Sequence, residues 1–327
     1  MLRFIQRPET DPYYNLAAEE HIFHTAEEDT FMTWRNNPAV IIGKHQNALK
    51  EINTDFVERH QIPVIRRITG GGTVYHDPGN INFSFIFTQR KENLIDFREF
   101  TRPVILFLHS LGLDAVFEGK NNITVDGRKV SGNSAHLYKN KILYHGTLLF
   151  ETDLEMLGKA IWSNEWLFKD KSVESVRAKT ININDLIRNK VSIDQFFIQF
   201  QKFISNYFGG YSLQILNEED RSSIKKLVEN KYKSFEWNFG YSPDYEFNNR
   251  FHHRDEEYSV YLHVKKGKIE LADIKGPATN NITLNEIETL LSGLNHQKSS
   301  IRKAFDQLSV KTPSLTEFLN FLLSKLF

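Results

Sequence analysis

The dipeptide Asp126-Gly127 stands between two short runs of alternating residues in the stretch NITVDGRKVSG. Asp-Gly is a strong signal for a two-residue hairpin turn. The turn predicts a register that runs outward through the pairs Val125–Arg128, Thr124–Lys129, Ile123–Val130 and Asn122–Ser131. Side chains alternate across a strand. We therefore expect an apolar face of Ile123, Val125 and Val130, and a polar face of Asn122, Thr124, Lys129 and Ser131. The polar face is either the wall of a site or a solvated surface.

Three consecutive glycines, 70–72, follow Arg66 and Arg67 in the stretch RRITGGGTVYHDPGN. Glycine is costly to order, so such a run needs a reason. One reason is a bulge or tight turn, and we expect the run to open a hairpin between strands 72–76 and 81–87, with DPGN as its turn. The other is a backbone platform whose N–H groups face a phosphate or carboxylate, held also by the two arginines. The Walker and Rossmann spacings are both missing.

Capping residues and periodicity predict further elements in the first two thirds of the chain. Asp11 and Pro12 start a helix. Residues 30–42 form two strands around an Asn-Asn-Pro turn, and residues 142–151 form a strand that contains Gly146. One face of strand 81–87 carries Ile81, Phe83, Phe85 and Phe87. A helix at 192–209 has a capping box of Ser192 and Gln195, ends at Gly209, and has an apolar stripe of Phe196, Phe200, Phe203, Ile204 and Tyr207. Residues 168–182 read as a long, mobile loop.

The last 80 or so residues differ from the rest in their pattern of polar and turn-forming residues. Residues 237–257 are polar and rich in turn formers, and residues 258–274 read as a hairpin. Two helices follow, each opened by a capping box: Thr283 with Glu286, and Ser314 with Glu317. Two strands and two helices suggest a small accessory α+β domain.

Composition excludes several classes of protein. The chain has 327 residues, 41 basic and 41 acidic side chains, and no cysteine. Balanced charge argues against a generic nucleic-acid or membrane binder. Without cysteine there is no disulfide, thiolate metal site or cysteine nucleophile. No signal peptide and no apolar run of membrane-spanning length is evident, so we expect a cytoplasmic protein.

Several single residues have both a structural and a functional interpretation. Lys129 is an ordinary exposed strand lysine or a point charge that bridges two anions. His76, at a strand end, is a catalytic group or a residue that satisfies nearby backbone. No zinc-type histidine spacing is present, and Ser131 and Ser134 have no evident histidine and aspartate partners for a hydrolase.

Several of these blocks occur together in a fixed order. RRITGGGTVYHDPGNINFSF, DGRKVSGNSAH and HGTLLF are preceded by WRNNPAVIIGKHQN and followed by SVRAKTIN and FEWNFGYSP. With these blocks the chain resembles lipoate–protein ligases over nearly its whole length. The resemblance implies an α/β (α+β) catalytic domain of the biotin/lipoate ligase type, with mixed and antiparallel sheets and flanking helices, at 1–245. It also implies a small α+β C-terminal accessory domain at 246–327.

The resemblance also implies a two-step reaction. Lipoate and ATP, with Mg²⁺ held mainly by the phosphates, give lipoyl-adenylate and pyrophosphate. A lysine of an acceptor then attacks the mixed anhydride and releases AMP. The acceptors implied are apo lipoyl domains of 2-oxoacid dehydrogenase acyltransferase subunits and the glycine-cleavage H protein. We expect a monomer that binds neither nucleic acid nor membrane.

Site residues are carried over from the family by position, with Lys129 as the catalytic residue that touches the lipoate carboxylate and the α-phosphate. The residues expected to bind ATP or the adenylate are Arg67, Gly72, Thr73, Val74, Tyr75, Asn80, Asn122, Lys129, Ser175, Arg177 and Lys179. Those expected to bind lipoate are Arg67, Gly70, Gly71, Gly72, His76, Lys129, Ser131, Gly132, His145 and Gly146. Asp77 is expected to shape the site, and Val176 belongs to the loop over the adenylate.

One position departs from the family pattern. Asn122 stands where an aspartate is usual, whereas Asn121 matches, so direct ligation of Mg²⁺ by residue 122 is in doubt. Three alternatives stay open: a non-catalytic lipoyl-binding protein, a lipoyl or octanoyl transferase, and a biotin ligase. The transferase uses a cysteine thioester, which this chain cannot form, and the biotin ligase has a Gly-Arg-Gly-Arg-Arg-Gly loop where RRITGGG stands here.

Overall fold

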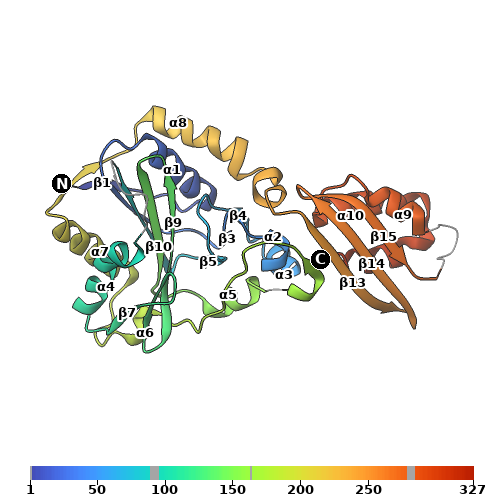
Figure 1. The fold of residues 1–327 in the computed structure, drawn as a ribbon, viewed down its shortest axis with the longest axis horizontal. Helices are drawn as coiled ribbons and strands as arrows, with labels where there is room; N and C mark the ends of the chain where they lie inside the picture. Colours follow the sequence, from blue (N-terminus) through green and yellow to red (C-terminus); the bar gives the residue numbers. More distant parts are fainter. Residues whose placement is uncertain (1, 89–95, 163, 278–283) are drawn as a thin grey trace.

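The computed structural model describes residues 2–88, 96–162, 164–277 and 284–327. A large mixed sheet forms the centre of the first part of the chain (Figure 1). Its strands lie in the order β12 (Tyr211–Gln214), β1 (Leu2–Gln6), β2 (Thr30–Trp34), β6 (Asn80–Phe87), β10 (Lys141–Leu149), β9 (Arg128–Tyr138), β8 (Asn122–Val125) and β7 (Ala115–Glu118). Strand β1 runs parallel to both of its neighbours, and the remaining pairs are antiparallel.

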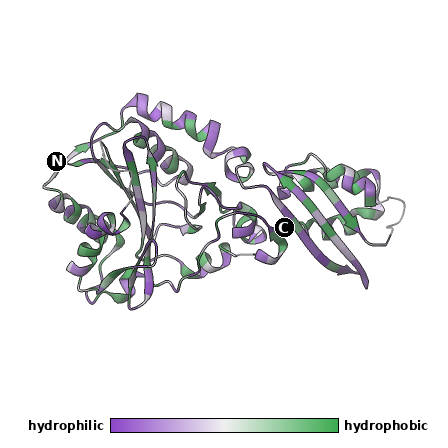
Figure 2. Cartoon of the chain, viewed as in Figure 1, coloured by the Kyte–Doolittle hydropathy of each residue, from purple (hydrophilic) through white to green (hydrophobic). Residues whose placement is uncertain are grey.

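Helices cover both faces of this sheet. Helix α1 (Pro12–Thr25) begins at Asp11, whose side chain accepts hydrogen bonds from the next turn as predicted, and packs with α8 (Glu218–Leu227) on one face. Helices α4 (Phe97–Ser110) and α7 (Ile193–Tyr207) cover the other. The predicted alternation of strand β6 is confirmed, because Phe83 and Phe85 pack on the second face. Hydrophilic and hydrophobic bands alternate along the helices (Figure 2), as one-sided burial requires.

A three-stranded sheet lies between this layer and the rest of the molecule. Its order is β4 (Val64–Arg66), β3 (Ala39–Ile42) and β5 (Val74–His76). Ile41 and Ile65 belong to the apolar cluster under α1, whereas Val40 and Ile42 belong to the cluster that continues into the C-terminal part. The small sheet is therefore buried on both faces, which explains its nearly continuous apolar strands.

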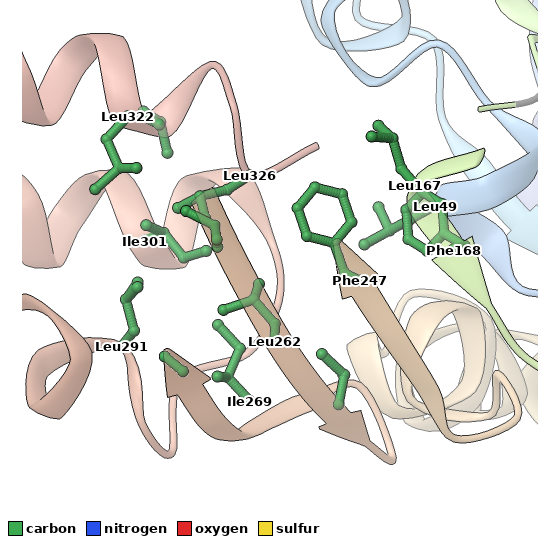
Figure 3. Packing of buried hydrophobic residues seen from close by; sticks show 14 of the residues in the cluster. Leu49, Leu167, Phe168, Phe247, Leu262, Ile269, Leu291, Ile301, Leu322 and Leu326 are labelled. Carbon is green, nitrogen blue, oxygen red and sulfur yellow. The ribbon is translucent and has the colours of Figure 1, made fainter. Parts of the chain in front are cut away.

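The C-terminal part is a second α+β unit, drawn in orange and red in Figure 1. Its sheet has the order β11 (Phe168–Lys169), β13 (Tyr245–His253), β14 (Glu256–Lys265) and β15 (Lys268–Lys275). Its helices are α9 (Leu284–Leu291), α10 (Lys298–Lys311) and α11 (Thr316–Leu323), with a 3₁₀ turn at Pro313–Leu315. Leu326, near the end of the chain, lies in one cluster with Leu49 and Phe247 (Figure 3), so the apolar core crosses from one unit to the other.

Short helices and turns complete the described chain. They are α2 (Ala48–Glu51), α3 (Thr54–Arg59), α5 (Leu154–Ala160), the 3₁₀ turn Glu165–Leu167, α6 (Ile183–Leu186), and π-helical turns at Val228–Tyr232 and Glu236–Gly240. Within the described residues, none of the helices is both long and apolar enough to cross a bilayer.

The structure corrects the predicted hairpin that followed the glycines. Strand β5 pairs with β3, whereas β6 pairs with β2 and β10, so the two strands lie in different sheets. The DPGN turn therefore carries the chain from the small sheet to the large one. The two strands predicted at 30–42, β2 and β3, are present and also belong to different sheets.

The Asp126-Gly127 hairpin is confirmed, but its register holds for only two pairs. Val125 pairs with Arg128 and Thr124 with Lys129, after which a bulge places Ser131 opposite Ile123 and Gly132 opposite Asn122. Ser131 is buried and accepts a hydrogen bond of 3.3 Å from the Asn133 side chain. Because residues that pair directly share a face, Ser131 lies on the core face with Ile123 instead of on the polar face.

Other expectations are confirmed in part. Helix α7 has the predicted capping box and a buried stripe, but Tyr207 at its end is exposed. Two elements were not predicted from the sequence: strand β13, which lies in the polar stretch 237–257, and helix α10, which lies after it. Helix α11 begins with no side-chain cap, since Ser314 lies inside the preceding 3₁₀ turn, so the Ser314–Glu317 box is wrong. Thr283 lies outside the described residues.

Candidate active site

A cavity of about 420 Å³ lies where the small sheet faces β9 and β10 of the large one. Most of the predicted site residues line it: Arg67, Gly70, Gly71, Gly72, Thr73, Val74, His76, Asn122, Lys129, Gly132, His145, Gly146 and Ser175. The glycine loop (residues 70–73), the hairpin β8–β9 and the loop before α6 thus meet around one space. Asn121, Ser134 and Thr147 also line it.

The glycine loop is held by its carbonyl groups. Arg67 donates from Nη2 to the carbonyl oxygens of Gly70 and Gly72, at 2.6 and 2.8 Å, and Ser134 donates to that of Gly70 at 2.9 Å. Gly71 has a φ of +85°, which favours glycine. Among the residues that the structure describes, no acceptor meets the N–H groups of residues 70–72. The loop therefore offers a row of backbone donors, the arrangement that binds anions.

Backbone packing supplies a second reason for the glycines. A Cβ on Gly43 would lie 2.0 Å from the carbonyl oxygen of Gly71, so the two chain segments touch directly. A Cβ on Gly72 would lie 3.0 Å from the Ser175 hydroxyl. The triple glycine is thus required partly because other segments of the protein pack directly against its backbone. Gly43 helps to form the site and was not predicted from the sequence.

The two arginines do not share the anion-holding role that the sequence suggested. Arg66 is fully buried, lies outside the cavity wall, and binds only protein acceptors. Arg67 does line the cavity, but its other donors reach the Thr69 hydroxyl at 2.9 Å and the Ile41 carbonyl at 3.1 Å. The expectation is wrong for Arg66. For Arg67 the structure adds a role in shaping the loop.

Lys129 is a cation without an anion. In the described part of the chain its ammonium has neither a carboxylate partner nor a hydrogen-bond acceptor, although it lines the cavity and is largely enclosed. Burial, and then the charge of Arg67, lower the pKa of Lys129. A Cβ on Gly132 would lie 2.9 Å from the ammonium nitrogen, so that glycine leaves room for it. An anion in this cavity would satisfy the lysine and the glycine loop together.

The segment of residues 170–179 (here the cover loop) lies over the cavity. The Ser175 hydroxyl accepts hydrogen bonds from the Thr73 N–H at 2.9 Å and from the Gln46 side chain at 3.0 Å, and it donates to the Glu51 carboxylate. Burial raises the pKa of Glu51. Ser175 therefore occupies one donor of the glycine loop.

Further contacts fix both ends of the cover loop. At the first end Lys50 lies 3.6 Å from the Asp170 carboxylate, and it also binds Glu174 at 2.6 Å. At the other end the Lys129 N–H donates to the Lys179 carbonyl at 2.7 Å. The side chains of Arg177 and Lys179 are exposed, and Arg177 lies over the ring of Trp162 at 5.6 Å. Neither side chain lines the cavity in this structure.

Four other predicted residues lie behind the cavity wall. Tyr75 is buried in the apolar cluster of the small sheet. Asn80 is buried and donates to the Asn82 side chain at 2.9 Å, and Ser131 lies on the core face. Asp77 ties backbone together by accepting from the N–H groups of Gly79 and Asp153. These residues position the wall and do not form its surface.

Two buried donors in the wall have no partner among the described residues. Asn36 donates to Nδ1 of His76 at 2.9 Å, which assigns the proton of the neutral ring to Nε2. That Nε2 and the Trp34 indole nitrogen are both buried and unbonded, and both residues line the cavity. Burial lowers the pKa of His76 to about 3, so the ring stays neutral and is no general acid or base near neutral pH.

His145 belongs to a buried network that sequence reasoning missed. Its Nδ1 lies 3.0 Å from the Glu19 carboxylate, and its Nε2 lies 2.8 Å from the Thr69 hydroxyl that Arg67 also binds. Burial would raise the pKa of Glu19, but His145 and a bond from Ser84 outweigh it and lower the pKa. The sequence signal was an acidic residue on the buried face of α1.

Another part of the wall is apolar. It is formed by Leu16, Trp34, Ile41, Val74, Phe97 and Ala135. Gly146 lies in this region, where a Cβ would come within 2.5 Å of the Phe83 ring, so this glycine makes room for core packing. The cavity thus has a cationic, donor-rich part and an apolar part, which suits an acid with an aliphatic tail beside a phosphorylated group.

Comparison with known proteins agrees with this geometry. Residues 11–205 match the model of the lipoyl protein ligase A/B catalytic domain, and residues 242–322 match that of the bacterial lipoate protein ligase C-terminus. The lipoate-protein ligase LplJ of Bacillus subtilis is 36% identical over 305 residues, which is 92% of each chain.

The solved structures that are similar in fold and sequence include two lipoate protein ligases. One is the bipartite lipoate protein ligase of Thermoplasma acidophilum, studied with its E2 lipoyl domain, with a TM-score of 0.64 and 27% identity over 73% of this chain and 96% of that one. The other is a lipoate-protein ligase A bound with ATP, with a TM-score of 0.62 and 27% identity over 73% of this chain and 98% of that one. The chain belongs to the lipoate–protein ligase family.

Proposed function

We propose that this chain activates lipoate with ATP in the cavity described above and then transfers the lipoyl group to a lysine of an acceptor lipoyl domain. The observation that carries the proposal is the ammonium of Lys129, which lacks an anionic partner in the described residues and shares its cavity with the unbonded N–H groups of the glycine loop. These groups suit a carboxylate and a phosphate that must be held together.

The two parts of the cavity suggest how the substrates divide it. The apolar wall around Leu16, Trp34 and Ile41 suits the aliphatic chain and ring of lipoate. The glycine loop and Lys129 suit the phosphates and the carboxylate. The Nε2–H of His76 is a further donor toward the ligand, and we keep Thr73, Val74 and Asn122 as proposed nucleotide contacts.

In the first step a carboxylate oxygen of lipoate attacks the α-phosphorus of ATP. A new O–P bond forms as the bond to the bridging oxygen breaks, and pyrophosphate leaves with the electron pair. Lys129 offsets the repulsion between the two anions, and its charge stabilises the oxygens of the α-phosphate as the transition state forms. No protein nucleophile is required.

In the proposed reaction Mg²⁺ would be bound mainly by the phosphates of ATP and not by a metal site made of protein side chains alone. The described residues contain no cluster of three or more His, Cys, Asp or Glu side chains that could hold a metal. The cavity wall offers the amides of Asn121 and Asn122, which suit an ion already held by phosphate oxygens. When bound, the ion would supply charge neutralisation at the phosphates.

In the second step the neutral amine of the acceptor lysine attacks the acyl carbon of lipoyl-adenylate. A C–N bond forms, the C–O bond to AMP breaks, and the nitrogen loses a proton. The structure of the Thermoplasma relative with its E2 lipoyl domain supports a lipoyl domain as acceptor. The H protein is a second proposed acceptor.

Other assignments remain proposals. We assign Ser175, Arg177 and Lys179 of the cover loop to the adenylate, and place the boundary between the catalytic and accessory domains at 245/246, where β13 begins. The matched family models support two units, although the apolar core is continuous between them. The monomeric state and the cytoplasmic location stay predictions.

The test is the intact mass of an apo lipoyl domain after incubation with this protein, Mg-ATP and lipoate. We expect a gain of one lipoyl group that depends on ATP, and none with biotin in a parallel reaction. An apo H protein in a third reaction tests the second acceptor. Lipoate that binds without any mass gain or pyrophosphate release would contradict the proposed reaction and leave a binding protein.

A further inference from the structure

Arg66 is one of the largest side chains in the molecule that are fully buried. On one side its Nη1 donates to the carbonyl oxygens of Gly43, Lys44 and Gln46, at 2.9, 3.0 and 2.8 Å. Residues 43–46 connect β3 to the start of α2, and we call them the support loop. One guanidinium nitrogen thus gathers three carbonyl groups of one loop.

The other side of Arg66 faces the segment that leads into the C-terminal unit. Nε donates to the carbonyl of Trp237 at 2.9 Å, and Nη2 donates to the carbonyl of Asn238 at 2.8 Å and the hydroxyl of Ser242 at 2.9 Å. The backbone joins in, because the Arg66 N–H donates to the Asn238 side chain and the Trp237 indole donates to the Arg66 carbonyl. Residues 237–242 are called the junction segment below.

The environment of this charge is unusual. No carboxylate among the described residues lies within ion-pair distance of Arg66, and every acceptor of its guanidinium is a neutral oxygen. Burying a charge without an opposite charge is expensive, and removing such a group leaves several carbonyls unsatisfied. Simple packing at this place would be served by an apolar side chain, so the rigid fork itself is the useful feature.

The support loop, together with Arg67 and Ser134, holds the glycine loop in place. Gly43 contacts the Gly71 carbonyl so closely that no Cβ fits. The Gln46 side chain accepts from the Gly43 N–H at 2.8 Å and from the Thr73 hydroxyl at 2.9 Å, and it donates to Ser175. A displacement of the support loop would therefore move the backbone donors at residues 70–73.

We propose that Arg66 is a positioning residue. It clamps the support loop to the junction segment, and it thereby fixes the position of the nucleotide-binding part of the cavity. The inference rests on the proposed use of ATP. It gives the junction block FEWNFGYSP, which carries no group of the cavity wall, a role in nucleotide binding.

The geometry makes this effect selective. The support loop contacts the glycine loop. Leu16, Trp34 and Ala135 of the apolar wall, together with His145, lie on α1 and the large sheet, where Arg66 makes no hydrogen bond, whereas only Ile41 and Val74 of that wall lie in the small sheet. Loosening the clamp should weaken binding of ATP and leave binding of lipoate nearly unchanged. If Arg66 merely stabilised the fold, its substitution would change the dissociation constants of both ligands or of neither.

The experiment measures the dissociation constants of Mg-ATP and of lipoate separately by titration calorimetry, together with the melting temperature. Arg66→Lys keeps the charge but not the fork, and we expect its Kd for ATP to rise about tenfold or more, the scale of losing charge-assisted hydrogen bonds. Ser242→Ala loosens the clamp from the junction side and should raise the same constant by a smaller factor. The lipoate constant should stay within about twofold of wild type in both.

Lys298→Ala is the matched control. Lys298 on α10 binds Asp55 and Glu58 of α3, so it also joins the two units, but it does not touch the support loop. We expect both constants to be unchanged in this variant. Ser242→Ala keeps the test available if Arg66→Lys does not fold.

The outcomes separate the possibilities. A selective loss of ATP affinity in the two clamp variants, with the control normal, supports the inference. Equal losses for both ligands, or unchanged ATP affinity in folded Ser242→Ala and Arg66→Lys, would overturn it. A wild-type chain that binds ATP but releases no pyrophosphate with lipoate would refute the proposed function instead, without bearing on the clamp.

Discussion

Gly43→Ala is the substitution whose consequence follows most directly from the structure. The new Cβ would lie 2.0 Å from the carbonyl oxygen of Gly71 and 3.0 Å from its carbonyl carbon. Real Cβ atoms essentially never come closer than 3.0 Å to such an atom, so the two segments must separate by about 1 Å. Both are backbone, and neither can escape by a change of rotamer.

The expected loss can be worked out from that displacement. The Gly71 carbonyl belongs to the loop whose N–H groups we assign to the phosphates, so a shift of about 1 Å misplaces those donors. Misplacement on this scale costs on the order of 100-fold in rate. We therefore expect kcat/KM for ATP in lipoate-dependent pyrophosphate release to fall about 100-fold. The loss should lie in kcat/KM for ATP, because the atoms nearest to the new Cβ belong to Gly71 and Gln46 and none belongs to the apolar wall that we assign to lipoate.

Two other glycines provide controls. Gly79→Ala creates a clash of the same size, since its Cβ would lie 2.0 Å from the Glu151 carbonyl, but Gly79 does not line the cavity. Gly79→Ala should lower the melting temperature without a comparable loss in kcat/KM for ATP. Gly158 in α5 has no atom within 4 Å of its Cβ position, so Gly158→Ala should be neutral or slightly stabilising.

A single result would refute this reasoning. If folded Gly43→Ala kept the wild-type kcat/KM for ATP, the glycine loop could not be the phosphate-binding element that we propose. A loss shared equally by Gly43→Ala and Gly79→Ala would point to general destabilisation instead.

Three further expectations follow from the site and the fold. Lys129→Ala should lower the rate of lipoyl-adenylate formation by roughly 10²–10³-fold; near-normal formation in a quenched single-turnover assay would remove Lys129 from its assigned role. Trypsin should cut within residues 169–180 more slowly with lipoate and ATP than without them, and equal cleavage would contradict the role of the cover loop. Burial lowers the pKa of His296 to about 4, so the unfolded chain binds this proton first as pH falls below about 6.5, and stability should drop between pH 6.5 and 4 by roughly 3 kcal/mol. Urea unfolding at pH 7 and pH 4 measures this, and His296→Gln should remove this part of the dependence, whereas the part that comes from the lowered pKa of His76 should remain.

Local chemistry made much of the fold predictable from the sequence. Asp11 and Ser192 cap helices through their own side chains, and Asp126-Gly127 forms its turn from two residues, so no distant contact is needed for these features. The alternation that places Phe83 and Phe85 on one face is equally local. The family resemblance then located most of the cavity wall, because its motifs fall on the segments that meet there.

What the sequence did not predict depends on contacts between distant segments. Strand β5 pairs with β3, more than 30 residues earlier, instead of with the strand that follows it. The bulge opposite Ile123 turns Ser131 to the core, and no local signal announces it. Arg66 and Arg67 are adjacent in sequence, yet they point to different partners, because successive side chains of an extended chain face opposite sides.

The cover loop and a nucleotide compete for the same group. In this structure the Thr73 N–H is bonded to Ser175, whose hydroxyl donates to the carboxylate of Glu51. A phosphate that took this N–H would have to displace Ser175, and it would then face Glu51 as another anion unless that carboxylate accepted a proton or a new donor. The raised pKa of Glu51 makes protonation easier than for an exposed glutamate. Movement of the cover loop is therefore coupled to phosphate binding through one backbone hydrogen bond, and the rate at which trypsin cuts within residues 169–180 should respond to ATP and not to lipoate alone.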